Sequence, residues 1–267
     1  MILYIKQFSD FIDDNSDIVI KNELKKRYKL DTRRQDKFIH LAIYGAQLLK
    51  DKIDIDCYDE LYVTSGVGDV DIVEKTNTCI YEDHEPLRIF DFINLLGNTT
   101  SYYVAKSLNI KGKNIFQISD NFTYINTLIS AYSSLKNSKK DAIICSVDLV
   151  SNNEETIKRV LDVDLKDNII SAVNYQKVSL NIDNAIGQIE FDTNIYDKRY
   201  INEMIKNSKE KIVYSNRCKS FKSEKDKFIF ETIASYEVNS CIKKQQDIVY
   251  IDCYKDKYKI LKIKSFK

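Results

Sequence analysis

The sequence has few of the residues with which enzymes usually surround a substrate. Among its 267 residues there are six glycines, one proline, two histidines and no tryptophan. Glycine lets a loop turn tightly and bring its backbone close to a ligand, so this scarcity is unusual for an enzyme that encloses its substrate. The only histidines are His40 and His84.

The sequence also lacks long apolar runs and an excess of one charge. No run approaches the roughly eighteen apolar residues of a membrane-spanning helix, and the amino-terminal MILYIKQF reaches a lysine without a small-residue cleavage site. We therefore expect a cytoplasmic protein without membrane insertion. Lysine plus arginine (41) and aspartate plus glutamate (40) nearly cancel, so no overall field attracts nucleic acid or an acidic membrane.

The cysteines stand far apart and form no C-x-x-C pair: Cys57, Cys79, Cys145, Cys218, Cys241 and Cys253. Several fall inside apolar strand patterns, so reduced and buried thiols are expected. Cys79, Asp83 and His84 are close enough in sequence to suggest a metal site. Without a second group of ligands at suitable spacing, an exposed polar loop is favoured, and we predict neither a metal nor a cofactor.

Hydrophobic periodicity predicts an α/β protein, either one large domain or two closely packed halves. Residues 32–50 place apolar side chains at helical spacing, with Thr32 or Asp31 as the cap. Further along, residues 114–118 predict a strand, residues 123–136 a helix, and residues 142–150 an apolar strand buried on both faces. This alternation favours a layered α/β sheet.

The second part of the chain continues the alternation. The stretches 169–180 and 184–191 predict two strands that pair with each other, and residues 192–198 are the best boundary, dividing residues 1–192 from a shortened half, 193–267. Expected elements outside these stretches are helices at 154–163, 198–208 and 228–243, a strand at 211–215, and a closing strand pair at 247–253 and 257–266. Lysine alternates with apolar residues in the last strand, which is typical of a sheet edge.

Four motifs occur in an order that resembles the β-ketoacyl synthases, members of the thiolase fold. RRQDKFIHLA (33–42) is similar to the family's R-x-D-R-F-x-x-L-A helix, and LYVTSGVGDV (61–70) to its strand and G-x-G turn. NTTSYYVAKSLNIKG (98–112) is similar to the asparagine, helix and G-L-x-G-P segment, and DAIICSVD (141–148) to the A-D-V-x-x-x-G-G strand. The resemblance implies a thiolase-like layered α/β/α/β/α architecture with a reduced second half.

The resemblance also implies that the catalytic groups are lost. Counting between the last two motifs puts the family's nucleophilic cysteine at Asn121, or at Phe122 with a slip of one residue. Neither side chain can form the thiolate that acyl transfer requires at the amino end of a helix. The strand of the first catalytic histidine resembles KIVYSNRCKS, where Asn216 or Arg217 takes its place, and the second half contains no histidine.

Non-catalytic relatives of this family, the chain length factors, pair with a catalytic ketoacyl synthase. The resemblance therefore implies a heterodimer with such a synthase in fatty acid or polyketide chain elongation, with an acyl carrier protein as a further contact. In the family's dimers the strand before the nucleophile pairs across the twofold axis, which implies an interface at Asn114, Ile115, Phe116, Gln117, Ile118 and Ser119. The implied lining of the partner's pocket is Phe90, Phe92, Leu95, Leu96 and Asn98.

Other interpretations stay open. A divergent acyl-thioester-binding enzyme of the thiolase fold would use non-standard residues in the same pocket, and a similarity limited to α/β layering would leave the function unassigned. Gly66 and Gly68 precede DVDIVE, whose three acids would repel phosphate, so a tight turn is favoured. Ser119 offers a nucleophile for a Ser/His/Asp triad, but a surface or interface role is favoured for His40 on the 32–50 helix.

Overall fold

The computed structural model describes residues 1–13, 19–119, 121–138, 140–150, 154–160, 169–215, 217–218 and 232–266. These residues form a sheet with the strand order β3-β2-β4-β5-β1-β6-β9-β8-β7. The strands are β1 (Ile2–Asp13), β2 (Glu60–Ser65), β3 (Asn114–Ile118), β4 (Ala142–Asp148), β5 (Ser171–Ser179), β6 (Gly187–Phe191), β7 (Lys211–Tyr214), β8 (Ile248–Tyr254) and β9 (Lys257–Ser265). β2 is parallel to β3 and β4, and β7 is parallel to β8, whereas the other neighbours are antiparallel.

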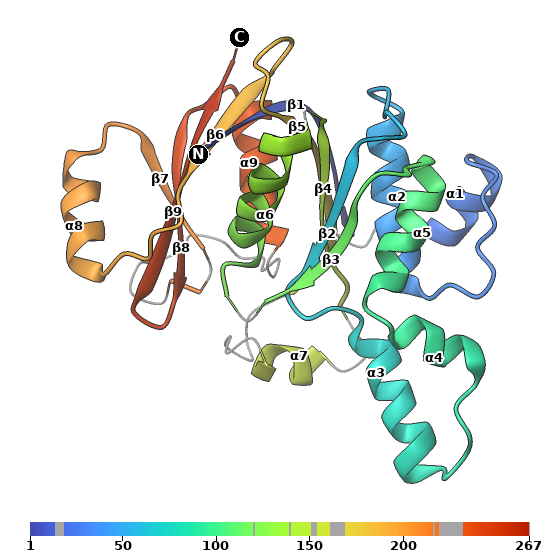
Figure 1. The fold of residues 1–267 in the computed structure, drawn as a ribbon. Helices are drawn as coiled ribbons and strands as arrows, with labels where there is room; N and C mark the ends of the chain where they lie inside the picture. Colours follow the sequence, from blue (N-terminus) through green and yellow to red (C-terminus); the bar gives the residue numbers. More distant parts are fainter. Residues whose placement is uncertain are drawn as a thin grey trace.

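Helices cover both faces of this sheet. They are α1 (Ile20–Lys26), α2 (Lys37–Lys50), α3 (Val70–Asn77), the π-helical η1 (Thr78–Glu82), α4 (Ile89–Leu95), α5 (Asn98–Leu108), α6 (Thr123–Ser138), α7 (Glu154–Val160), α8 (Lys198–Asn207) and α9 (Thr232–Lys243). The sheet bends around α6 and α9, while α2 and α5 lie outside one half and α8 outside the other (Figure 1). The layer order is therefore α/β/α/β/α, as the resemblance implied.

The central helical layer is apolar because it contacts both halves of the sheet. Leu128 of α6 and Val238 of α9 share one cluster with Tyr62 of β2 and Leu261 of β9. β4 is buried along its whole length, since its alternate side chains enter this cluster and the cluster beneath α2 and α5. The prediction of a strand buried on both faces is thus confirmed.

Two predicted strand positions are wrong. The strands β5 and β6 do not pair with each other, because β1 lies between them and is antiparallel to both. β9 is not an edge strand, since β6 and β8 flank it, and the sheet ends at β3 and β7. The lysines of β9 fit a central position because Lys262 and Lys264 point to solvent. Alternation shows which face of a strand is polar, not which strands are its neighbours.

The start of α2 also differs from the prediction. The helix begins at Lys37, and its cap is Asp36 rather than Thr32 or Asp31, because the Asp36 carboxylate accepts the amide of Ile39 at 2.8 Å. The preceding segment folds back over the helix, so that Nε2 of His40 lies 3.2 Å from the carbonyl oxygen of Thr32.

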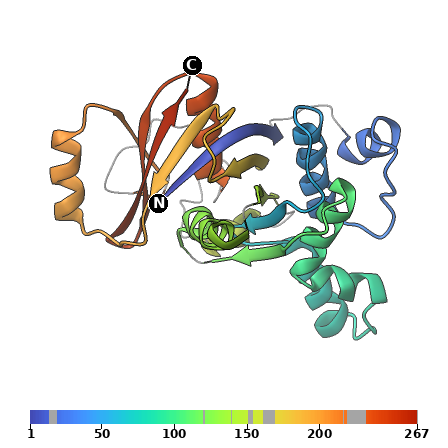
Figure 2. The same ribbon diagram turned by 45° about the horizontal axis from the view of Figure 1, so that its top comes forward.

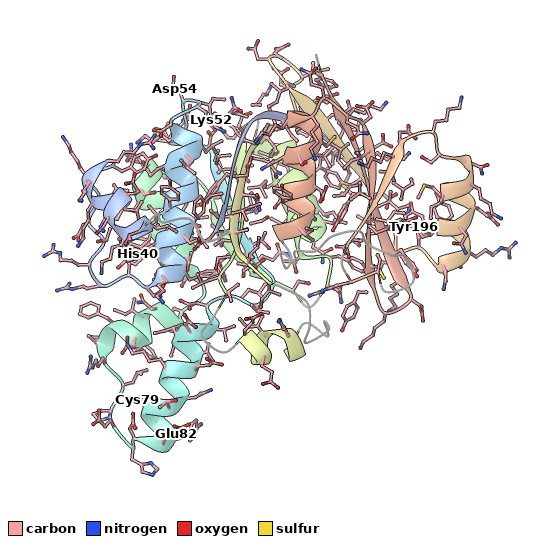
Figure 3. The ribbon with its side chains drawn as sticks, turned by 180° about the vertical axis from the view of Figure 1, so that it is seen from behind. His40, Lys52, Asp54, Cys79, Glu82 and Tyr196 are labelled. Atoms are coloured by element: carbon pink, nitrogen blue, oxygen red, sulfur yellow. The ribbon has the colours of Figure 1, made fainter. Side chains whose placement is uncertain are left out.

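This arrangement corrects the role predicted for His40, which Figure 3 labels on α2. The residue is 5% exposed, so it belongs to the core beneath the folded-back segment rather than to a surface. Burial lowers the pKa of His40, opposed by the contact with Thr32.

The other predicted elements agree with the structure within a few residues. The helix predicted at 154–163 is described as far as residue 160, and the helix predicted at 228–243 from residue 232 onward. The boundary at residues 192–198 stays a prediction, and β6 before it pairs with β9 after it.

Candidate functional site

The chain turns from β3 into α6 at residues 119–122, of which 119, 121 and 122 are described. Phe122 is only 3% exposed and has a φ of 53°, a left-handed conformation that is rare for a bulky side chain. The hydroxyl of Ser119 donates to the carbonyl oxygen of Asn121 at 2.8 Å, and the hydroxyl of Thr123 donates to the carbonyl oxygen of Ser119 at 2.6 Å. Packing and these hydrogen bonds therefore hold a sharp strand-to-helix corner where the sequence predicted one.

The described residues of this corner offer no ready nucleophile for acyl transfer. Asn121 has a neutral carboxamide and Phe122 a hydrocarbon ring. Ser119 is hydrogen-bonded to the backbone of the corner and His40 contacts Thr32, so the contacts do not form a Ser/His pair. Asp120 lies outside the described residues.

A buried amine from the second half faces this corner. Lys259 of β9 is 6% exposed, and its Nζ donates to Oδ1 of Asn126 at 3.2 Å and lies 5.9 Å from the ring centre of Phe122. Burial lowers the pKa of Lys259, and the carboxylates of Asp192 and Asp252 oppose this shift. The corner and the second half thus meet at a lysine.

Asp252 of β8 is the cross-strand neighbour of Lys259. Asp252 is buried, and burial raises the pKa of its carboxyl. Arg217, the hydrogen bonds of the carboxyl and Lys259 lower this pKa and so oppose the shift. Sequence reasoning missed both residues, although Lys259 has the same strand parity as the core residues Leu261 and Ile263. This alternation along β9 was the signal that could have placed Lys259 on the buried face of the strand. The predicted position Asn216, beside Arg217, lies outside the described residues.

Two of the buried thiols lie away from the corner. Cys218 and Cys253 belong to the cluster beneath α8, on the face of β8 opposite to the cluster that contains Phe122. All six cysteines are free, four of them buried, whereas Cys57 and Cys79 are half-buried. Burial raises the pKa of the Cys241 thiol to about 12, which keeps it in the unreactive protonated form.

The predicted interface residues lie on an edge of the sheet. β3, which comprises Asn114, Ile115, Phe116, Gln117 and Ile118, pairs with β2 on one side and ends the strand order on the other. Ile118 is 49% exposed, and Ser119 directly after the strand is half-buried. The edge therefore presents backbone groups and apolar side chains to the surroundings.

The predicted pocket residues lie beside that edge. α3, η1 and α4 form an arm, residues 70–96, that projects from the body (Figures 1 and 2). Phe90, Phe92 and Leu96 are exposed on it, while Leu95 is half-buried and Asn98 is exposed at the start of α5. A methyl group on Gly97 would lie 3.3 Å from the ring of Phe116, which brings the base of the arm against β3.

The G-x-G segment after β2 is a tight turn held by a carboxylate. Oδ1 of Asp148 accepts the hydroxyl of Ser65 at 2.7 Å and the amide of Gly66 at 2.8 Å. Gly68 has a φ of 73°, a conformation that favours glycine. Because a carboxylate takes the amide that a phosphate would need, the predicted turn is confirmed.

The tip of the arm carries the half-buried Cys79 in η1 and the exposed His84 in the loop that follows, and Figure 3 labels Cys79 there, far from the label of His40. Within the described residues there is no group of three or more histidine, cysteine, aspartate or glutamate side chains that could hold a metal ion. None of the described helices has the length and apolarity needed to cross a bilayer.

No model of a known family matches the sequence, and no curated protein matches it either. Solved structures do match. The ishigamide ketosynthase/chain length factor has a TM-score of 0.71 at 10% identity, with 94% of this chain and 86% of that chain covered.

A ketosynthase in complex with its chain length factor from Xenorhabdus doucetiae has a TM-score of 0.62 at 8% identity, with 98% and 99% covered. The ketosynthase from module 6 of the bacillaene synthase from Bacillus subtilis 168 has a TM-score of 0.63 at 8% identity, with 100% and 71% covered. The chain therefore has the thiolase-like fold of ketosynthases and chain length factors.

Proposed function

We propose that this chain is a non-catalytic subunit, similar to a chain length factor, that pairs with a catalytic β-ketoacyl synthase in fatty acid or polyketide chain elongation. The observation that carries the proposal is the corner between β3 and α6. The fold keeps the strand-to-helix turn at the position that the resemblance assigns to the nucleophile. Its side chains, Asn121 and Phe122, cannot accept an acyl group.

The exposed edge of β3 supports a paired subunit. A strand with an open edge can bind a second strand through its backbone groups, and the apolar side chains Ile115, Phe116 and Ile118 would add buried area. In the proposed complex Asn114, Gln117 and Ser119 complete this interface.

The arm extends the same surface. Phe90, Phe92 and Leu96 are large, exposed and apolar, and Gly97, directly after Leu96, packs against Phe116 of β3, so they would contact the same partner. Together with Leu95 and Asn98 they would line the partner's acyl pocket. The complex would work in the cytoplasm and receive its acyl chains from an acyl carrier protein.

The test is co-purification with a β-ketoacyl synthase encoded beside this chain. We expect a stable complex that Ile118→Glu weakens, because a charge at an apolar interface is costly to bury. Ile182→Glu is the matched control, since Ile182 is 54% exposed and lies in the turn between β5 and β6. A tight homodimer that ignores such synthases, or equal effects of both substitutions, would contradict the proposal.

A second candidate is a divergent acyl-thioester-binding enzyme, and the buried Lys259 beside the corner favours it. A neutral lysine amine can attack a thioester: an amide bond forms, the carbon–sulfur bond breaks, and the proton lost by the amine leaves with the released thiol. Intact mass after incubation with acyl-coenzyme A would show the added acyl group. The adduct should disappear in Lys259→Met and persist in Lys264→Met, an exposed lysine of the same strand. An unmodified wild-type chain that turns nothing over eliminates this candidate.

A further inference from the structure

Two cysteines that are distant in the chain meet at the end of the β7–β8 ladder. β7 is parallel to β8, and the amide of Ser215, directly after β7, continues the ladder by donating to the carbonyl oxygen of Ile251 at 2.9 Å. The chain then turns back, because the amide of Cys218 donates to the carbonyl oxygen of Ser215 at 2.9 Å. This turn brings Cys218 beside Cys253, which follows Ile251 by two residues on β8.

The side-chain contacts show the same proximity. Sγ of Cys218 lies 3.6 Å from the carbonyl oxygen of Ile251, and Sγ of Cys253 lies 3.6 Å from the carbonyl oxygen of Arg217. Each thiol therefore touches the backbone within two residues of the other cysteine, and the two thiols are hydrogen-bonded to each other. Both belong to the apolar cluster between β8 and α8 (Figure 1).

The pairing makes one of the two thiols the better nucleophile. The hydrogen bond from Cys218 lowers the pKa of the Cys253 thiol, although burial opposes this shift, and the same bond raises the pKa of Cys218. The thiolate is the reactive form of cysteine, so Cys253 reacts first. The other two buried thiols contact groups of a different kind, since Cys145 interacts with Tyr175 and Cys241 donates to the carbonyl oxygen of Gln246.

We propose that Cys218 and Cys253 are a modification site, at which a peroxide forms a disulfide that thiol reductants reverse. The Cys253 thiolate attacks one oxygen of hydrogen peroxide and the O–O bond breaks; the departing hydroxide takes up the thiol proton, which leaves a sulfenic acid and water. The sulfur of Cys218 then attacks that of Cys253: the S–S bond forms, the S–O bond breaks, and the hydroxyl leaves as water with the Cys218 proton. Two thiols and one peroxide give one disulfide and two waters, and two electrons pass to the peroxide.

Burial restricts this reaction to small oxidants. Cys218 is 2% exposed and Cys253 is 7% exposed, but Cys253 lies close to the exposed turn at Lys255 and Asp256, between β8 and β9. Local opening of such a turn admits a molecule little larger than water. A structural zinc site takes four ligands, and in the described ranges no group of three or more histidine, cysteine or acidic side chains could hold a metal ion. A disulfide is complete with two thiols.

The crosslink fixes the segment that contacts the buried Asp252. Ser215 hydrogen-bonds to the Asp252 carboxyl and Arg217 stabilises its charge, and both residues lie in the turn that ends at Cys218. A protein in a reducing compartment forms such a bond transiently, as a response to oxidant. The site uses no residue of the proposed interface, so it stands apart from the proposed function.

The test uses the full chain, reduced with dithiothreitol, desalted, and treated under native conditions with one equivalent of hydrogen peroxide. We expect the intact mass to fall by two hydrogen atoms. A peptide map made without reduction should contain a Cys218–Cys253 link, and fresh dithiothreitol should remove it. A map without this link, or with either cysteine joined to a different residue, overturns the proposal.

Cys218→Ser and Cys253→Ser should each prevent the loss of two hydrogens, because the remaining thiol then has no partner. Cys241→Ser is the matched control, since Cys241 is 3% exposed and contacts the backbone of Gln246 instead of a second cysteine. The control should still form the link. A link-deficient control, or an undiminished mass loss in either of the first two variants, contradicts the proposal. Should a serine variant not fold, the map of the wild-type chain decides by itself.

Discussion

Replacing Lys177 with methionine tests a buried ion pair that ties the middle of the sheet to two loops. Nζ of Lys177, on β5, lies 3.1 Å from Oδ2 of Asp59 and 3.6 Å from Oδ2 of Asp141, and it donates to the carbonyl oxygen of Asp54 at 3.1 Å. Asp59 is buried directly before β2. Methionine has a similar length and no charge, so the substitution leaves the Asp59 carboxylate buried without its cation.

The expected loss is about 3 kcal/mol of unfolding free energy. Removing one partner of a buried pair costs about 3–5 kcal/mol, because the remaining charge is desolvated without compensation. The lower end of this range applies because Asp59 can take up a proton, which removes the buried charge. Since a domain is stable by about 5–15 kcal/mol, the midpoint of urea unfolding followed by circular dichroism should fall by roughly 1 M or more.

The loss should depend on pH with a definite sign. Burial raises the pKa of Asp59, and Lys177 opposes that shift, so the variant has the higher pKa. A carboxyl with a raised folded pKa contributes full stability below its unfolded pKa of about 3.9 and loses it as the pH rises through the folded pKa. The deficit of Lys177→Met should therefore narrow from pH 7 toward pH 4.

The double variant Lys177→Met/Asp59→Asn should recover part of the loss at pH 7, because no buried charge is left. The reasoning is refuted if Lys177→Met unfolds at the wild-type urea concentration at pH 7, or if its deficit grows on acidification.

Three further predictions concern single side chains. The melting temperature should fall as the pH rises from about 4 toward 9, because the folded state keeps a proton on Asp69, whose pKa burial and Asp36 raise to about 9. Asp69→Asn should flatten this profile, and an unchanged profile would contradict the prediction. Tyr62→Phe removes the hydroxyl that donates to Oε2 of the buried Glu60 at 2.7 Å, so the unfolding free energy measured in urea should fall by about 1–3 kcal/mol. An unchanged unfolding free energy would mean that this hydrogen bond does not stabilise the fold. Gly112→Ala would press a methyl group against the carbonyl oxygen of Asp59, which should lower the melting temperature. A melting temperature equal to that of the wild type would count against the described packing.

Much of the local structure was predictable because it depends on short-range patterns. The alternation in residues 114–118 predicted β3 with its exact bounds, and the helical spacing after Thr123 predicted α6. The corner between them follows from these two elements, so the position that the resemblance assigns to a nucleophile could be located from the sequence. A twofold or 3.6-fold repeat of apolar side chains is a property of neighbouring residues, and the sequence displays it directly.

The surroundings of the corner were not predictable in the same way. Lys259 and Asn126 are 133 positions apart, yet they form one hydrogen bond beside Phe122. The lysine pattern of β9 suggested an edge, because alternation describes the two faces of a strand and carries no information on its neighbours. His40 likewise belonged to the core because the preceding segment folds back over α2.

By itself, the sequence determined most of the secondary elements and the burial of strands such as β4. The tertiary structure decided that β1 separates β5 from β6, that the sheet bends around α6 and α9, and that the caps of α2 and α3 bring Asp36 and Asp69 together. The physical reason is that these contacts join residues far apart in the chain. Their free energy depends on how the whole core packs, which no local pattern records.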